Sequence, residues 1–243
     1  MPSVFAMWFG FDYGQCLMDS RFRKIEYWLA ATLIDEEAER GGTIDSKLNI
    51  YRKLVEKYGG WRKVMEKGRD EIHRLILDDN PVLIRRFYEV EQKLLKPAEG
   101  LEEALRYLKS KHNILNVVTD LGSGHALNTI QRFLNNHNMR HFFTNIYSPA
   151  GVVRGDGVFD LSFKGVSKED GSMYDKMKEE LKKINIDVKE AVIVGDDPKK
   201  DIEQAKKRGF ITVHWVGQSS AFKEPSKEAD YVITSFTQLK EIF

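Results

Sequence analysis

The chain has 243 residues, 42% of them hydrophobic, so it can bury a full core and is neither fibrous nor disordered. Its 38 basic and 37 acidic residues nearly cancel, which gives no indication of a nucleic-acid or acidic-membrane partner. The single cysteine, Cys16, excludes an internal disulfide framework and fits a reducing compartment.

The first predicted element is a buried strand over residues 4–11, which runs into a glycine-bearing turn with Asp12 at its tip. The segment around it lacks the cationic start and the small-residue cleavage site of a signal peptide. Asp12 interrupts the first apolar run, and no other apolar run is long enough to span a bilayer. We therefore expect a cytoplasmic protein without a membrane partner.

Residues 21–95 form a block with apolar residues at helical spacing and no convincing strand, as in RKIEYWLAATLIDEEAE and VLIRRFYEVEQKLL. Strands and helices alternate after Pro97. The predicted strands cover residues 114–120, 141–148, 190–197, 210–217 and the start of 230–243, and the predicted helices cover residues 100–112, 125–137, 172–184, 201–209 and the end of 230–243.

This alternation is typical of an α/β fold with a Rossmann-like, doubly wound parallel sheet that has helices on both faces. The helical block separates the first strand from its partners, so we interpret it as an inserted all-helical cap domain over residues 19–95. Residues 1–18 and 96–243 would then form the core domain.

Polar side chains follow the apolar stretches of three predicted strands. They are Asp12 after VFAMWFGF, Thr119 and Asp120 after ILNVV, and Asp196, Asp197 and Asp201 after AVIVG. Because the carboxyl ends of parallel strands share one edge of a sheet, we expect these side chains to converge. Clustered carboxylates repel one another unless a cation intervenes, and oxygen ligands suit Mg²⁺, so the sequence predicts a magnesium site.

The first two of these segments resemble motifs of the haloacid dehalogenase superfamily, whose members are mostly phosphate-monoester phosphatases. FDYGQCLMDS is similar to the motif that carries a nucleophilic aspartate, with Asp12 in that place and Leu17, Asp19 and Ser20 as further matches. NVVTD is similar to the second motif, with Thr119 in the phosphate-binding position.

The third and fourth motifs follow in the family's order. KEDGSMYDKM resembles the third, with Lys168 as its lysine and Glu169 where the family has proline. VGDDPKKDIEQAKKRG resembles the fourth, with Asp196 and Asp201 as its acidic residues. The resemblance therefore covers almost the whole chain, and it implies a cap domain where the helical block lies.

Gly14 departs from the pattern of the family's phosphatases. They carry at this position an aspartate that protonates the leaving group and later activates water, and such help is typically worth about 10²-fold to 10⁴-fold in rate. Gly14 has no side chain for either step, but it keeps the backbone carbonyl that serves the family as a metal ligand. Gln15 and Cys16 replace the usual glycine and threonine that follow.

The resemblance implies a Mg²⁺-dependent phosphohydrolase that acts on a small phosphorylated metabolite through an aspartyl-phosphate at Asp12. We expect catalytic roles for Asp12, Thr119 and Lys168, and substrate binding by Thr119, Asp120 and Lys168. The implied metal ligands are Asp12, the carbonyl of Gly14, Asp196 and, in support, Asp201. The expected partner is the small-molecule substrate, and the sequence leaves open whether the chain is a monomer or a homodimer.

Three alternatives remain open. The lack of an acid at Gly14 is compatible with a catalytically weak phosphate-binding or regulatory protein. Dehalogenases of the superfamily carry tyrosine at this position, whereas Tyr13 lies one position early and would point to the opposite face of an extended strand. Phosphonate-cleaving members carry a small residue there and form a Schiff base with a cap lysine, for which the candidates are Lys47, Lys53, Lys57 and Lys63.

Several of the residues also have ordinary structural interpretations. Asp196 and Asp201 could cap and cover a helix that begins near Pro198, and Lys164 and Lys176 compete with Lys168. Cys16 is interpreted as a packing residue, and the GSG at 122–124 as a loop close to the phosphate. Histidines without zinc-site spacing are interpreted as surface groups or satisfied core groups, and these are His73, His125, His137, His141 and His214.

Overall fold

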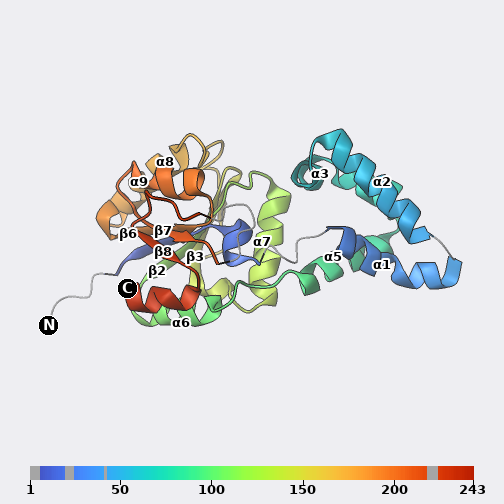
Figure 1. Ribbon diagram of the computed structural model, residues 1–243. Helices are drawn as coiled ribbons and strands as arrows, with labels where there is room; N and C mark the ends of the chain where they lie inside the picture. Colours follow the sequence, from blue (N-terminus) through green and yellow to red (C-terminus); the bar gives the residue numbers. More distant parts are fainter. Residues whose placement is uncertain (1–5, 20–24, 41–42, 218–223) are drawn as a thin grey trace. The chain divides into compact units, whose positions relative to one another are not determined.

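The structure is a computed structural model that describes residues 6–19, 25–40, 43–217 and 224–243 (Figure 1). The chain divides into two compact units. The first consists of Met1–Ser20 and Lys96–Phe243, and the second consists of Arg21–Leu95, whereas the expected cap begins two residues earlier, at residue 19. Ser20, one of the residues that match the first motif, lies outside the described residues.

The first unit is built around an eight-stranded sheet in the order β5-β4-β3-β2-β1-β6-β7-β8. In the part of this order that runs β3-β2-β1-β6-β7-β8, every pair of neighbouring strands is parallel. The strands are β1 (Trp8–Phe11), β2 (Ile114–Val118), β3 (Phe143–Ser148), β4 (Gly151–Val153), β5 (Phe159–Asp160), β6 (Ala191–Gly195), β7 (Ile211–Trp215) and β8 (Tyr231–Ile233). This mostly parallel sheet confirms the predicted α/β fold class.

Strands β4 and β5 correct the expectation of a purely parallel sheet. They extend the sheet beyond β3 as an antiparallel pair of strands at its edge. They have only three and two residues, so no alternation of apolar and polar positions could develop in the sequence.

Helices cover both faces of this sheet. Figure 1 shows α8 and α9 on one side and α6, with the carboxyl-terminal helix, on the other. The helices are α6 (Leu101–Ser110), α7 (Gly124–Asn136), α8 (Ser172–Lys183), α9 (Gln204–Lys206) and α10 (Leu239–Ile242), with 3₁₀ turns at Arg140–Phe142, Val188–Glu190 and Phe236–Gln238. The layered arrangement is the one expected from alternating strands and helices.

Strand β1 packs against both helical layers. Trp8 belongs to the core cluster that contains Tyr174 and Met177 of α8, whereas the ring of Phe9 meets the ring of Phe243 at 5.2 Å. A side chain at Gly10 would come within 2.7 Å of the Trp8 ring, so only glycine fits there. This packing holds the end of β1 in a central position between β2 and β6.

The second unit is helical over its described residues, 25–40 and 43–95. Its helices are α1 (Ile25–Arg40), α2 (Thr43–Tyr58), α3 (Trp61–Lys67), α4 (Arg69–Leu75) and α5 (Pro81–Leu94). Asn80 caps α5 by accepting hydrogen bonds from two main-chain N–H groups of its first turn, and Pro81 occupies the first helical position. Trp28 and Phe87 join α1 to α5 with ring centroids 6.3 Å apart.

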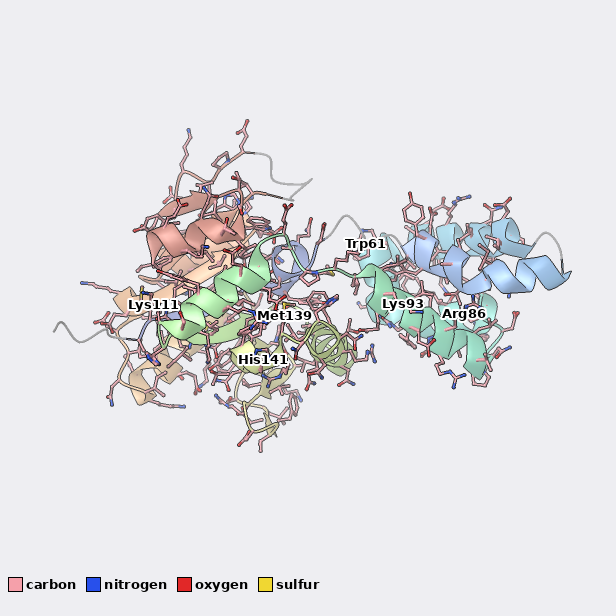
Figure 2. All side chains as sticks on the ribbon, turned by 90° about the horizontal axis from the view of Figure 1, so that it is seen from below. Trp61, Arg86, Lys93, Lys111, Met139 and His141 are labelled. Carbon is pink, nitrogen blue, oxygen red and sulfur yellow. The ribbon has the colours of Figure 1, made fainter. Side chains whose placement is uncertain are left out.

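Figure 2 labels Trp61 at the start of α3, and Arg86 and Lys93 on α5. None of the helices within the described ranges has the length and apolar character that crossing a bilayer requires.

Candidate active site

The sheet register brings three of the predicted site residues to one edge. Phe11, the last residue of β1, lies in register with Val117 of β2 and Val194 of β6. Asp12 is the next residue, and the strands on its two sides end at positions 118 and 195. Thr119 and Asp196 follow those ends, so the three side chains lie at the same carboxyl edge and all are buried.

Lys168 joins two of the carboxylates. It lies in the loop before α8, and its Nζ donates to Asp12 Oδ1 at 2.5 Å and to Asp201 Oδ1 at 2.6 Å. Its side chain is only 2% exposed, whereas Lys164 is exposed and Lys176 pairs with Glu179 at the surface. The structure therefore distinguishes Lys168 from the two lysines that competed with it in the sequence.

The carboxylates of Asp12, Asp196 and Asp201 have ligand atoms that all lie within 4.8 Å of one another. Burial, and the nearby charge of Asp201, raise the pKa of Asp12 to about 7 even though Lys168 lowers it. Burial and the charges of Asp12 and Asp201 raise the pKa of Asp196 to about 9. Burial alone would lower the pKa of Lys168, but Asp12 and Asp201 outweigh it and hold that pKa above its ordinary value.

This donor set fits a divalent cation. Three carboxylates and one ammonium group, when all are ionised, leave excess negative charge in a buried volume, and the raised pKa values of Asp12 and Asp196 are the result. A hard cation with oxygen ligands would offset that charge, and carboxylates are the ligands that Mg²⁺ prefers.

The segment after β6 explains the roles of its acidic residues. Asp197, and not Asp196, caps the turn Pro198–Glu203 by accepting from the N–H groups of the second and third residues of that turn. Asp201 is 2% exposed, so it is not a surface residue of a helix. A Cβ atom at Gly195 would lie 2.3 Å from the Asp201 carboxylate, so glycine at 195 is required for Asp201 to occupy this place.

Asp120 connects the loop after β2 to the loop that carries Lys168. Its Oδ1 accepts from the backbone N–H of Lys168 at 2.9 Å, and its Oδ2 lies 3.3 Å from Lys200 Nζ. Lys200 Nζ also lies 3.2 Å from the carboxylate of Glu169. Sequence reasoning did not single out Lys200. Its ion pairs are with carboxylates from two other loops, Asp120 and Glu169, and its place in the motif gives no signal of them.

Thr119 ends the second strand. Its backbone N–H donates to the Tyr147 carbonyl at 3.0 Å, and its Oγ1 accepts from the N–H of Leu121 at 3.3 Å. Ser123, in the middle of the GSG stretch, caps α7 by accepting from the N–H of Ala126. The loop after β2 is therefore held by the sheet at one end and by a helix cap at the other.

Comparison with known proteins identifies the family. A family model of haloacid dehalogenase-like hydrolases matches residues 51–215. The chain belongs to this family. A glyceraldehyde 3-phosphate phosphatase from Pyrococcus furiosus is 28% identical over 177 residues, which cover 70% of this chain and 66% of that protein. The chain thus matches just under two thirds of the length of this curated relative.

Solved structures of haloacid dehalogenase-like proteins share the fold. A HAD phosphatase from Thermococcus onnurineus superposes with a TM-score of 0.60 at 15% identity and 97% coverage of both chains. The proposed HAD-hydrolase YfnB from Bacillus subtilis, solved with bound magnesium, superposes with a TM-score of 0.58 at 19% identity and 98% coverage of both chains. At these identities the likeness concerns the fold.

Within this haloacid dehalogenase-like fold, the loop after β1 takes an irregular helical turn over Tyr13–Leu17. Gly14 has φ −75° and ψ 122°, values that any residue can adopt, so the backbone does not require glycine there. Gln15 instead has φ 63°, in the left-handed region where a side chain costs about 1 kcal/mol or more. The usual glycine of the family would avoid this strain.

Cys16 and Tyr13 pack into the core. The Sγ of Cys16 donates to the Val194 carbonyl at 3.6 Å, and burial, with the charges of the nearby carboxylates, raises its pKa, so it remains a thiol. This confirms its interpretation as a packing residue. Tyr13 is buried, with its ring in edge contact with Phe133 of α7 at 5.4 Å.

The cap lysines give little support to a Schiff-base mechanism. Lys47 pairs with Asp78 and Lys57 with Glu71, each at 2.6 Å. The hydrogen bond to Glu71 raises the pKa of Lys57, whereas an amine nucleophile needs a lowered one. Lys53 and Lys63 are exposed.

His214 is a site residue that sequence reasoning did not single out. It is fully buried on β7, and burial lowers its pKa, so the ring is neutral. Its Nε2 lies 3.1 Å from the carbonyl oxygen of Asp196. The signal in the sequence was a lone polar ring in the apolar strand ITVHW, since a buried polar group must find hydrogen-bond partners.

Proposed function

We propose that this member of the haloacid dehalogenase-like family is a Mg²⁺-dependent phosphohydrolase that acts on a small phosphorylated metabolite. The observation that carries the proposal is Lys168 Nζ lying between Asp12 Oδ1 and Asp201 Oδ1 beside the third carboxylate, Asp196. The names of two relatives, a glyceraldehyde 3-phosphate phosphatase and a HAD phosphatase, also support it.

In the proposed mechanism, Asp12 attacks phosphorus. A bond forms from its carboxylate oxygen to phosphorus while the bond to the leaving oxygen breaks, which gives an aspartyl-phosphate and divides one displacement into two. Water then attacks phosphorus, releases phosphate and restores Asp12. Lys168 orients the attacking carboxylate and offsets phosphoryl charge, and Thr119 donates a hydrogen bond to a phosphoryl oxygen.

Asp12, the Gly14 carbonyl and Asp196 would hold the metal ion, with Asp201 in support through Lys168 and the N–H of Asp197. When bound, Mg²⁺ supplies positive charge to the phosphoryl oxygens. No side chain at position 14 can protonate the leaving oxygen, so that proton comes from another source or the oxygen leaves without one.

Removal of Mg²⁺ tests this proposal. The purified protein should hydrolyse p-nitrophenyl phosphate with added Mg²⁺, and excess EDTA should lower the rate at least about 100-fold, because a Lewis acid contributes several kcal/mol to phosphoryl transfer. Adding Mg²⁺ back should restore the rate. Hydrolysis that is equally fast in EDTA would contradict the metal requirement.

Substitution of Gly14 by Asp tests the missing acid. The φ and ψ values at this position accept a side chain, so we expect the variant to fold. Phosphate esters of alcohols should be hydrolysed about 10²-fold to 10⁴-fold faster, and aryl phosphates should gain much less, because a good leaving group needs no proton. The wild-type protein should correspondingly show a steep dependence of rate on the pKa of the leaving group.

Gly14→Asn is the matched control, because it adds the same volume without a transferable proton. No gain from Gly14→Asp on alcohol esters, or a loss, would favour the second candidate, a catalytically weak phosphate-binding or regulatory protein, or specialised chemistry. The specific observation behind that candidate is the absent side chain at Gly14.

A further inference from the structure

We propose that His214 is a positioning residue that fixes the peptide group carrying Asp196 and thereby sets the affinity of the site for a divalent cation. This inference rests on the proposed metal site and assigns a residue that lies outside the four sequence motifs. It concerns orientation of the main chain and requires no change in the charge of the ring.

The hydrogen bonds of His214 define its tautomer. Nδ1 accepts from the main-chain N–H of Ser226 at 2.9 Å, and an N–H group can only donate. The proton of the neutral ring is therefore on Nε2, which donates to the Asp196 carbonyl at 3.1 Å. Each ring nitrogen has one defined partner, so the ring is fixed in orientation.

The Asp196 carbonyl is one end of a planar peptide group whose other end is also held. The N–H of that group belongs to Asp197, and it donates to Asp201 Oδ2 at 3.1 Å. His214 and Asp201 thus hold one rigid plane from opposite ends. A tilt of this plane would move the backbone of Asp196 and the hydrogen bond to Asp201 together.

The surroundings explain why a side chain must do this. Strand β6 ends at Gly195, so the carbonyl of Asp196 lies beyond the regular hydrogen bonding of the sheet. In the register of β6 and β7, His214 pairs with Gly195, one residue before Asp196. From that position the ring reaches the first carbonyl after the strand.

Two substitutions test the hydrogen bonds of the two ring nitrogens separately. The Nε2 of glutamine reaches about as far as the Nε2 of histidine, so His214→Gln keeps a donor for the Asp196 carbonyl. Asparagine reaches only about as far as Nδ1, so His214→Asn keeps an acceptor for Ser226 and loses the donor. Both are neutral and polar, and circular dichroism in metal-free buffer checks that each variant folds.

Isothermal titration calorimetry with Mg²⁺ measures the effect. We expect His214→Gln to bind within about 3-fold of the wild type and His214→Asn to bind about 10-fold to 100-fold more weakly, the usual loss when a group that orients a ligand is removed. The control is Thr212→Val on the same strand, because Thr212 bonds to Asp230 and not to Asp196. It should leave the Mg²⁺ affinity unchanged.

A measurement on the metal-free wild type needs no variant. Nitrogen-15 NMR should show a protonated Nε2 and an unprotonated Nδ1 on His214. A proton on Nδ1, or equal Mg²⁺ affinities of the Gln and Asn variants, would overturn the inference while leaving the metal site intact. Failure of the wild type to bind Mg²⁺ would instead overturn the proposed metal site, and with it the positioning role.

Discussion

Replacement of Asp12 by Asn should lower kcat for p-nitrophenyl phosphate at least about 10³-fold, because the proposed covalent nucleophile is lost while the shape of the side chain is kept. Lys168 donates at 2.5 Å to one oxygen of the Asp12 carboxylate, the group proposed to attack phosphorus. An amide nitrogen or oxygen at that place cannot form the aspartyl-phosphate. Steady-state kinetics with saturating Mg²⁺ measure the effect.

Asp160→Asn is a suitable control for the Asp12 variant. Asp160 lies in the same unit, on β5, and pairs with Arg154 at 2.5 Å, and three strands, β4, β3 and β2, separate β5 from the β1 strand that leads to Asp12. Its replacement should leave kcat within about twofold, since a partly exposed pair contributes little and touches no site residue. Activity that survives Asp12→Asn would remove Asp12 from the nucleophilic role and point to water attack directly on the substrate.

Replacement of Lys168 by Met should lower the free energy of unfolding in metal-free buffer by about 3–5 kcal/mol, the usual cost of removing one partner from a buried ion pair. The Lys168 ammonium lies between Asp12 and Asp201, and both the lysine and Asp201 are 2% exposed. Without it, no ion pair among the described residues joins a cation to Asp12 or Asp201. Urea denaturation of both proteins, fitted with a common m-value, measures the difference.

A second substitution tests the cause of this loss. Adding Asp12→Asn to Lys168→Met removes one of the uncompensated charges, so the double variant should be more stable than Lys168→Met alone. Lys176→Met is the matched control, because Lys176 pairs with Glu179 at the surface, and it should not change the stability measurably. A Lys168→Met protein as stable as the Lys176→Met protein would contradict a stabilising role for the ion pairs of Lys168.

The spacing of apolar residues in this chain, and the order of its polar residues, could be read from the sequence. Period-two and period-3.6 patterns depend on local geometry, so the buried strand before Asp12, the helical block and the alternation after Pro97 could be predicted. Parallel strands share a carboxyl edge, which was enough to expect Asp12, Thr119 and Asp196 in one place.

Folding alone decided which polar atoms meet. Lys168 and Asp12 are 156 positions apart in the chain, and Cys16 and Val194 are 178 apart. The motif resemblance favoured Lys168 over Lys164 and Lys176, but only folding buries it beside carboxylates from two other loops.

The antiparallel strands β4 and β5, the left-handed Gln15 and the bond from His214 to the Asp196 carbonyl escaped prediction for related reasons. Each depends on contacts that form on folding, and the spacing of apolar residues does not predict such contacts. The sequence by itself determined the kinds of elements and the chemical groups at their ends. The tertiary structure determined their partners, because hydrogen bonds and ion pairs depend on distances of a few ångströms between segments remote in the chain.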